Sequence, residues 1–382
     1  MKATKRFLVL FLLATGTLQA QQGYKFDVEK YGGAVCDGVT DDTAAIQKTV
    51  DAAAAIVQQN GSPGPIYFPP STHPCKVDTL TWPSVTRGWL YSLFDNGLYA
   101  NRIVVGSFNA FVGRSSTFQT GSLFPYGPKV SWVQWQKPTN SGAFVDIKSA
   151  SNISFKNIGI DIGYSPGIAV NIHGWCVQIK FDESGVGGRF VVERGGFNLR
   201  ILDSTLVSRH GVALSITDFG YVTVRGGYLQ SAAIIESPNV PLMDGYIFDD
   251  LLSENLTNHD WLTLKGGPYG ISNVSLSNIR MADTVGSGYL VNNQAMHSAI
   301  TIRNCGWNDG LSLVNPASAP NGLSGIIESM GARATYEKAK AAFQWGQFTS
   351  TQGPTIFYGN PTFLKHIGAP MNVDHEASFV RH

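Results

Sequence analysis

The chain has 382 residues, a formal net charge of +1, 42 glycines and only 14% charged residues. A typical soluble protein has roughly a quarter charged residues and about 7% glycine, so this composition argues against a helical bundle, a coiled coil and a charge-rich disordered protein. Apolar residues make up 43% of the chain, which is enough for a large core. We therefore expect a soluble, glycine-rich, all-β protein.

Residues 1–20 have the order of a secretory signal peptide. The basic residues Lys2, Lys5 and Arg6 precede an apolar run at 7–13, and small residues follow. We therefore expect a secreted or periplasmic protein. Removing this segment leaves 25 basic against 27 acidic residues, formally −2. This balance predicts no nucleic-acid partner and no membrane association after cleavage.

A capping helix is expected near residues 41–57. Thr40, Asp41, Asp42 and Thr43 suit a helix N-terminus, where acidic groups are favourable. Apolar residues on one helical face follow at positions 45, 46, 50, 53 and 57. On this interpretation Asp41 and Asp42 start a helix and do not form a catalytic pair.

From about residue 150, a short alternating apolar pattern recurs and ends in a turn residue. The final positions of its seven copies are Asn157, Phe181, Asp203, Gly226, Asp250, Asn278 and Asn304, at steps of 22 to 28 residues. Second alternating segments follow at 168–172, 212–216, 261–264, 289–291 and 311–313. This period, without intervening helices, predicts a β-solenoid over residues 21–330.

The remaining parts of the chain are expected at the two ends of this stack. Residues 60–140 are rich in aromatic residues, proline and glycine, and are candidates for early coils. Residues 331–382 are expected to form a C-terminal cap and tail, with Tyr336, Ala339 and Phe343 marking a short amphipathic segment. Caps are needed because exposed strand edges invite aggregation.

Residues 31–47 (YGGAVCDGVTDDTAAIQ) resemble the opening motif of the pectin lyase-like superfamily, with Gly33 and Cys36 as local departures. Polygalacturonases, rhamnogalacturonases, related lyases and phage tailspike depolymerases share this opening. The resemblance implies a right-handed parallel β-helix with an N-terminal capping helix, acting on an acidic polysaccharide. It does not fix the reaction, because the fold hosts hydrolases, lyases, epimerases and non-catalytic binders.

Three polar residues lie just before second strands and form a candidate catalytic row: His210, Asp260 and Asp309. Consecutive members are two coils apart, or ~10 Å at the strand spacing. Two carboxyl groups ~6.5–9.5 Å apart suit inverting glycoside hydrolysis, so Asp260 and Asp309 are the predicted carboxylates. His210 is expected to act as a base or, together with Arg209, to bind a uronate carboxylate. A structural role in turns is the alternative for each of them.

The polygalacturonase motifs match in part. Residues 258–266 (NHDWLTLKG) are similar to the segment around the paired aspartates, with His259 in place of the first, and residues 209–211 (RHG) are similar to the histidine motif. The chain has neither an Asn-Thr-Asp nor an Arg-Ile-Lys motif. The candidate substrate-binding residues are Arg209, His259, Trp261, Lys265 and Trp307. The two tryptophans suit stacking on sugar rings, with burial in the core as the alternative.

Other polar groups are expected to be structural. Asp250 falls in the turn column of the repeats, so Asp249 and Asp250 form no catalytic pair. Cys176 and Cys305 are five coils apart, ~24 Å, which exceeds the reach of a disulfide. Cys36 and Cys75 both lie in the cap, and a disulfide between them is a hypothesis.

These observations predict cleavage of glycosidic bonds in a uronate-containing polysaccharide, with hydrolysis ahead of β-elimination. Elimination would need a base such as His210, His259 or Lys265 and a cation for the uronate carboxylate. A non-catalytic β-helix that binds polysaccharide or serves as a surface scaffold is the third possibility. No cofactor is predicted, and metal dependence, the sugar and the oligomeric state stay open.

Overall fold

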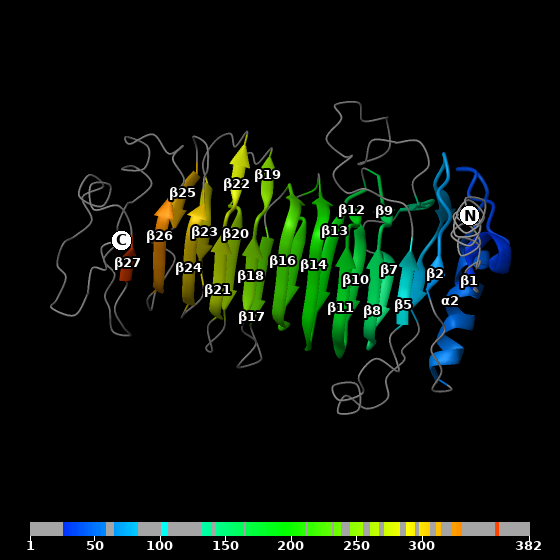
Figure 1. The fold of residues 1–382 in the computed structure, drawn as a ribbon, viewed down its shortest axis with the longest axis horizontal. Coiled ribbons are helices and arrows are strands. Elements are labelled where there is room, and N and C mark those ends of the chain that lie inside the picture. Colours follow the sequence, from blue (N-terminus) through cyan, green and yellow to red (C-terminus); the bar gives the residue numbers. More distant parts are fainter. Residues whose placement is uncertain are drawn as a thin grey trace, which may run out of the picture.

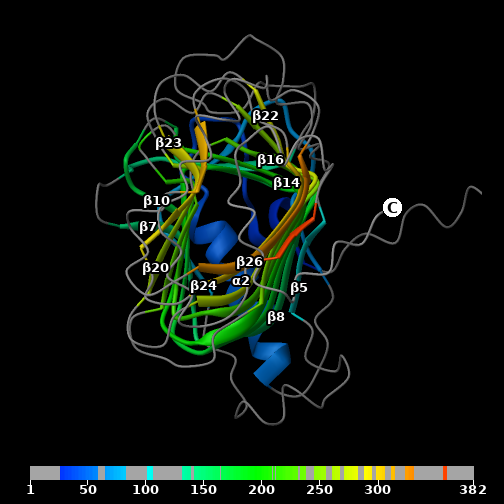
Figure 2. The same cartoon turned by 90° about the vertical axis from the view of Figure 1, so that its left-hand side faces the viewer.

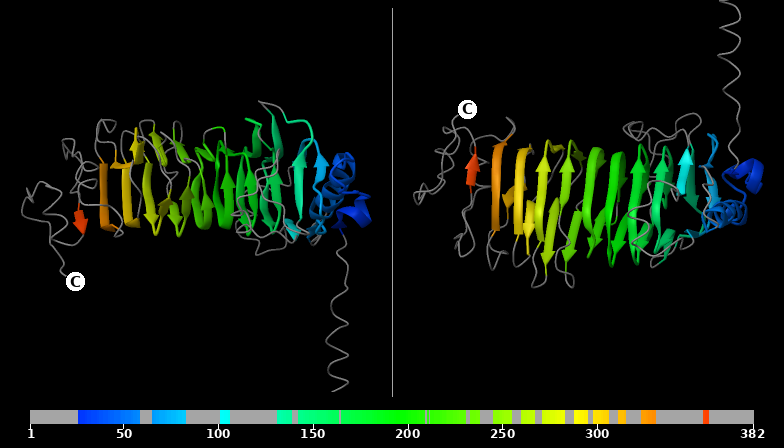
Figure 3. Two further views of the ribbon diagram at one scale, coloured as in Figure 1. Left: turned by 90° about the horizontal axis from the view of Figure 1, so that it is seen from above. Right: turned by 60° about the horizontal axis from the view of Figure 1, so that its bottom comes forward.

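The computed structural model describes residues 26–58, 65–82, 101–105, 131–138, 142–163, 165–208, 210, 212–230, 233–237, 245–254, 260–266, 271–282, 288–294, 298–305, 311–314, 323–330 and 356–358. These residues form a stack of parallel strands around one elongated core (Figure 1). The strands lie across the long axis, and the coils follow one another along it (Figure 3). In this part of the chain, no helix has the length and apolar character needed to cross a membrane.

Two sheets enclose the core (Figure 2). Within the described residues, the nine-stranded sheet contains β4 (Leu80–Trp82), β7 (Ala143–Lys148), β10 (Ile168–His173), β13 (Arg189–Glu193), β15 (Leu214–Thr217), β17 (Ala233–Ser237), β20 (Leu262–Gly266), β23 (Gly288–Asn293) and β25 (Leu311–Val314). All its pairings are parallel. This sheet contains the predicted second segments.

The 18-stranded sheet forms the rest of the wall in the described residues. It begins with β1 (Phe26–Asp27), β2 (Ile66–Tyr67), β3 (Cys75–Val77), β5 (Asn101–Val105), β6 (Trp132–Trp135), β8 (Ser151–Lys156), β9 (Gly159–Asp161), β11 (Cys176–Asp182), β12 (Gly185–Gly187) and β14 (Gly196–Val207). It continues with β16 (Gly220–Leu229), β18 (Tyr246–Asp249), β19 (Leu252–Glu254), β21 (Ile271–Ser277), β22 (Arg280–Ala282), β24 (Ser298–Cys305), β26 (Leu323–Met330) and β27 (Ile356–Tyr358). The all-β parallel β-helix expected from the repeats is confirmed.

The register of the 18-stranded sheet agrees with the sequence repeats at all copies except one. Opposite one another lie Ile153, Ile179, Leu199, Val222, Tyr246, Val274 and Ile300. The second copy was expected to start at Val177 and end at Phe181. In the structure Phe181 pairs with Phe155, so this copy ends two residues later, at the turn residue Glu183. A shift by two residues keeps the same face of a strand inward, so alternation alone cannot distinguish the two registers.

A column of left-handed residues makes each coil turn at the same place. Asn157, Glu183, Asp203, Asp250 and Asn278 have φ angles of 55°, 48°, 47°, 52° and 54°. Asn and Asp tolerate this region better than most residues. Four of them directly follow a strand and Asp203 lies at the matching bend inside β14, so the Asn/Asp column is structural, as expected.

The Asp249 carboxylate next to this column is held by the following coil. Ser277 Oγ and Asn278 Nδ2 donate to it at 2.6 and 3.0 Å, and Arg225 lies 3.3 Å away. Burial alone would raise the pKa of Asp249, but these hydrogen bonds and the Arg225 charge hold it below its ordinary value. The pair of aspartates is therefore a turn structure, as expected.

The core is a continuous column of apolar side chains from both sheets. Phe155 and Phe181 stack with ring centroids 4.5 Å apart, and Phe181 meets Phe190 of the opposite sheet edge to face at 4.9 Å. All three side chains are buried. Phe181 therefore joins successive coils and also the two sheets.

The N-terminal cap comprises a π-helical turn η1 (Val28–Gly32) and helix α2 (Thr43–Gln58). Asp41 Oδ1 accepts a hydrogen bond from Thr43 N at 3.0 Å, so it caps the helix, as expected for a helix start. The buried Asp42 carboxylate accepts hydrogen bonds from Val35 N and Cys36 N at 2.6 and 3.0 Å. Neither carboxylate is part of a catalytic pair.

The cysteines behave as expected. Cys36 and Cys75 form a disulfide that joins the segment before α2 to β3. Cys176 and Cys305 are free and buried.

The segment 60–140, which showed no clear period, supplies β2 to β6, and β27 adds a strand within the segment expected to be the tail. The predicted signal peptide and the amphipathic segment around Tyr336 lie outside the described residues.

Candidate functional site on the nine-stranded sheet

Two of the three predicted catalytic residues lie in the described part of the chain. His210 is exposed four residues before β15, and Asp260 is half-buried two residues before β20. Asp260 Oδ2 accepts a hydrogen bond from Asn292 Nδ2 of the next coil at 2.6 Å. Arg209, His259, Trp307 and Asp309 are not among the described residues.

The strand register does not put His210 and Asp260 at equivalent positions. Leu214 lies opposite Ala233, and Ala233 lies opposite Leu262. Counting back from these strands, Val212 and not His210 is the counterpart of Asp260. The proximity of both residues to a turn made them look equivalent in the sequence, although the two turns differ in length.

Two predicted substrate-binding residues have other roles in the structure. Trp261 is 0% exposed and packs edge to face on Phe248 at 5.6 Å, so the expectation that it stacks on a sugar is wrong. Its ring is needed to fill the core beneath β20. Lys265 forms an ion pair of 3.0 Å with Glu236 on the neighbouring strand, and both side chains are partly exposed.

A row of polar side chains crosses the outer face of the nine-stranded sheet. We call it the charged row, and its members are Lys148, His173, Glu193, Thr217, Glu236 and Lys265, each opposite the next on adjacent strands. The residues just before them, Ile147, Ile172, Val192, Ile216, Ile235 and Leu264, are all 0% exposed. Alternate residues of a strand face opposite sides, so the charged row faces outward and runs along the long axis.

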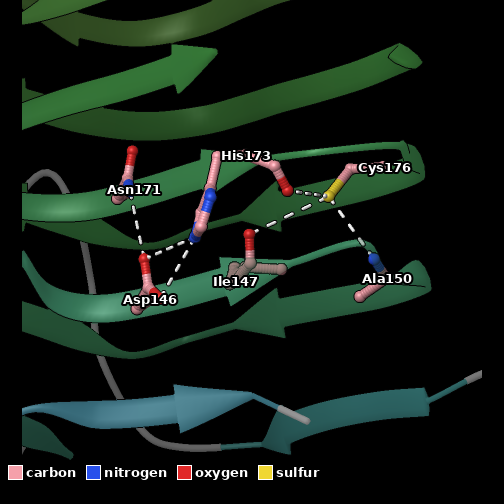
Figure 4. A network of polar contacts seen from close by, with 6 residues as sticks. All are labelled: Asp146, Ile147, Ala150, Asn171, His173 and Cys176. Carbon is pink, nitrogen blue, oxygen red and sulfur yellow. Dashed lines mark hydrogen bonds and ion pairs between the residues drawn. The ribbon is translucent and has the colours of Figure 1, made fainter. Parts of the chain in front are cut away.

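A hydrogen-bonded network stands at one end of the charged row (Figure 4). His173 Nε2 lies 3.0 and 3.1 Å from the two carboxylate oxygens of Asp146, and Asn171 Nδ2 donates to Asp146 Oδ1 at 3.0 Å. The His173 and Asp146 side chains are 28% and 26% exposed. The pair is thus held firmly and still reaches the surface.

This network has the form of an oriented general base. A carboxylate facing one imidazole nitrogen favours the tautomer with its proton on that nitrogen, here Nε2. The second nitrogen, Nδ1, then carries the lone pair that can accept a proton. Lys148, exposed on β7 directly opposite His173, places a cation beside this base.

The cap contains a cluster with metal-ligand atoms but not the chemistry of a metal site. In the described residues, ligand atoms of Cys36, Asp42 and Cys75 lie within 4.8 Å of one another. Both sulfur atoms are consumed by the disulfide, and the Asp42 oxygens accept backbone hydrogen bonds. The cluster therefore holds the cap together.

The charged row was missed in the sequence, although part of its signal was present. The predicted strand 168–172 ends one residue before His173, and continuing its alternation by that residue places Asn171 and His173 on the outer face. Strands β7, β13 and β17 were not predicted, so their outward residues could not be aligned. A search for polar residues at alternating positions of every coil would have found them.

Comparisons with known proteins do not identify a function for this chain. No family model matches the chain, and no curated protein matches it significantly. Two solved structures are similar to it. PfbA, a surface adhesin of Streptococcus pneumoniae, has a TM-score of 0.41 and 13% identity, covering 80% of this chain and 87% of that one. ORF18 of Geobacillus virus E2 has a TM-score of 0.35 and 15% identity, covering 83% of this chain and 63% of that one. At this level of similarity, the function has to be argued from the residues of this chain.

Proposed function

We propose that the protein cleaves a uronate-containing polysaccharide by β-elimination at the charged row. The observation that carries the proposal is the Asp146–His173 pair, about a quarter exposed on the outer face of the nine-stranded sheet, with Lys148 on the neighbouring strand. Sequence alone ranked hydrolysis ahead of elimination. We place elimination first because the Asp146–His173 contact orients a candidate base and Lys148, opposite His173 on the next strand, is a candidate cation.

The proposed reaction removes the proton α to the uronate carboxylate. His173 Nδ1 accepts this proton, and Asp146 stabilises the imidazolium that forms. The C–H electrons form a carbon–carbon double bond and the glycosidic C4–O bond breaks, so the leaving oxygen departs and is protonated by the imidazolium or by water. Lys148 pairs with the uronate carboxylate and stabilises the negative charge that develops on it.

The direction of the charged row suits an extended polymer. Its members lie one per coil, ~4.8 Å apart along the long axis, so a chain lying over the sheet passes each of them in turn. Lys148 and Lys265 stand near the two ends of the row, with the acidic residues Glu193 and Glu236 between them. An export signal at residues 1–20 would bring the protein to extracellular polysaccharides.

The decisive experiment separates elimination from hydrolysis. Purified protein is incubated with polygalacturonate, alginate and a neutral polysaccharide, and both ultraviolet absorbance and new reducing ends are followed. Elimination gives both signals on an acidic polymer, because the new double bond is conjugated with the carboxylate. We expect His173→Ala to lower kcat by roughly 10²–10⁴-fold and Asp146→Asn to lower it by a smaller factor.

A matched control is His73→Ala, since His73 is exposed, lies against Gly38 in the cap and is not a member of the charged row. This variant should keep wild-type activity. Elimination that persists in His173→Ala would refute the proposed base. Far-ultraviolet circular dichroism of each variant separates loss of chemistry from loss of fold.

Inverting hydrolysis is the second candidate. Glu193 and Glu236 flank Thr217 in the charged row, so their backbones are about 10 Å apart, close to the ~6.5–9.5 Å that inverting enzymes use between carboxyl groups. Asp260, hydrogen-bonded to Asn292, is a third carboxylate near this sheet. Reducing ends without absorbance, lost in Glu236→Gln or Asp260→Asn, would support hydrolysis. Binding with neither signal would support a non-catalytic role.

A further inference from the structure

Three aromatic rings from successive coils lie together on the surface, where the nine-stranded sheet turns into the 18-stranded sheet. We call them the aromatic ladder: Trp175 in the turn between β10 and β11, Phe197 in β14 and Tyr221 in β16. Their centroids are 6.1 and 6.5 Å apart, in edge-to-face contacts. Trp175 is 40% exposed and Tyr221 60%. Scattered apolar residues are common on surfaces, but a contiguous aromatic strip marks a binding surface.

The left-handed backbone conformation at the position of Tyr221 does not require an aromatic residue. Asn152, Gln178, Asn198, Tyr221 and Asn273 share one strand position and one left-handed conformation, with φ between 53° and 70°. Polar amides are therefore the usual occupants. Tyr221 departs from this pattern, and its departure extends the ladder by one coil.

A glycine of the following coil lies against each terminal ring. Opposite Tyr221 stands Gly245, and a Cβ there would lie 3.2 Å from Tyr221 Cδ1. Opposite Trp175 stands Gly195, whose Cβ would lie 3.4 Å from the Trp175 ring. Glycine suits the left-handed φ of both positions, and at the position of Gly245 the other coils place Asn, Gln or Tyr in this conformation. The two glycines thus make room for the rings, which stay 40% and 60% exposed at the surface.

Cations and amides border the ladder. Arg194 is exposed in the turn three residues before Phe197, and Arg200 Nε donates to Asn198 Oδ1 at 3.1 Å, which orients its guanidinium at the surface. Guanidinium groups pair with carboxylates, amides hydrogen-bond hydroxyl groups, and aromatic rings stack on the apolar faces of sugars. This combination matches an acidic sugar chain better than an apolar peptide or a lipid.

We propose that the aromatic ladder, with Arg194 and Arg200, is a non-catalytic binding strip for an acidic polysaccharide, adjoining the charged row. The strip runs along the long axis, as the charged row does, and only the short turn after His173 separates the two. The proposal rests on the ligand class of the proposed function, but not on its cleavage chemistry. Its role is to hold the polymer while the charged row acts on it.

The test measures binding and cleavage separately. The mobility of each variant is measured in native gels containing polygalacturonate, alginate or a neutral polysaccharide, and kcat is measured on short uronate oligosaccharides. The double variant Trp175→Ala/Tyr221→Ala should lose roughly tenfold in affinity for an acidic polymer, with kcat on short substrates unchanged. Trp175→Phe/Tyr221→Phe, which keeps both rings, should retain most of the affinity.

Ile247→Ala is the matched apolar control, because Ile247 is 43% exposed on β18 of the same sheet. Equal loss of affinity in this variant, or unchanged affinity in the double alanine variant, would overturn the proposal. Preference for the neutral polymer would overturn the role of the arginines. Ladder-dependent binding without any cleavage would support the strip while refuting the proposed enzyme. If the double alanine variant bound and cleaved long polymers as well as wild type, the result would support the proposed enzyme and refute the binding strip.

Discussion

Replacing Phe181 by alanine tests whether the aromatic column joins the coils as the structure indicates. The ring is 0% exposed, stacks on Phe155 at 4.5 Å with planes 7° apart, and contacts Phe190 of the opposite sheet at 4.9 Å. Truncation of a buried phenylalanine costs about 3–5 kcal/mol, and each aromatic pair adds about 0.5–1.5 kcal/mol beyond the buried area. We expect the free energy of unfolding to fall by about 5 kcal/mol.

The assay is guanidinium denaturation followed by circular dichroism. Phe181→Leu fills part of the space and should lose less than the alanine variant. Ile247→Ala, at an exposed position of the same sheet, should change stability by no more than about 0.5 kcal/mol. If Phe181→Ala lost no more stability than Ile247→Ala, the ring would not join coils and sheets, and the description of the core would be wrong.

Three further outcomes follow from the cap, the thiols and the turn column. Removing the Cys36–Cys75 disulfide, which closes a separation of 39 residues, should cost about 4 kcal/mol of stability, measured by denaturation of the double serine variant. Burial raises the pKa of the Cys305 thiol to about 11 and raises that of Cys176, so iodoacetamide at neutral pH should label both only after unfolding; labelling of the native protein would contradict their burial. Because the pKa of Asp249 is lowered in the folded state, its carboxylate stabilises the fold above the ordinary value of about 3.9, and this contribution is lost as the pH falls through the lowered pKa. Asp249→Asn should therefore be less stable than wild type at pH 7 and equal to it in strong acid.

The fold was predictable because alternation and turn residues recur in every coil. A strand that buries every second residue leaves a clear pattern, and the left-handed turns select Asn, Asp or Gly. The error at Phe181 arose because a shift by two residues preserves that pattern, and only the paired strands reveal the true partner, Phe155. Coils interrupted by long connections, as between β5 and β6, have no adjacent copy with which to align.

The candidate site was less predictable because its residues come from several strands and meet only when those strands pair with the correct register. His173 and Lys148 are 25 residues apart and meet only once β7 and β10 are paired. For Trp261 the sequence left sugar stacking and core burial both open, because strict alternation cannot bury two consecutive residues, yet Trp261 and Leu262 are both 0% exposed. His210 and Asp260 were equated through turns of unequal length.

The parallel stacking has a mechanical consequence. Interstrand hydrogen bonds point along the long axis, whereas the covalent chain winds around it, so tension on the two ends is carried coil by coil through noncovalent contacts. Under load the protein should lengthen by peeling single coils and not by cooperative rupture. At the N-terminal end the Cys36–Cys75 disulfide links the cap to β3. This covalent bond prevents the cap from separating from β3 under tension, so we expect extension to begin in the coils that follow.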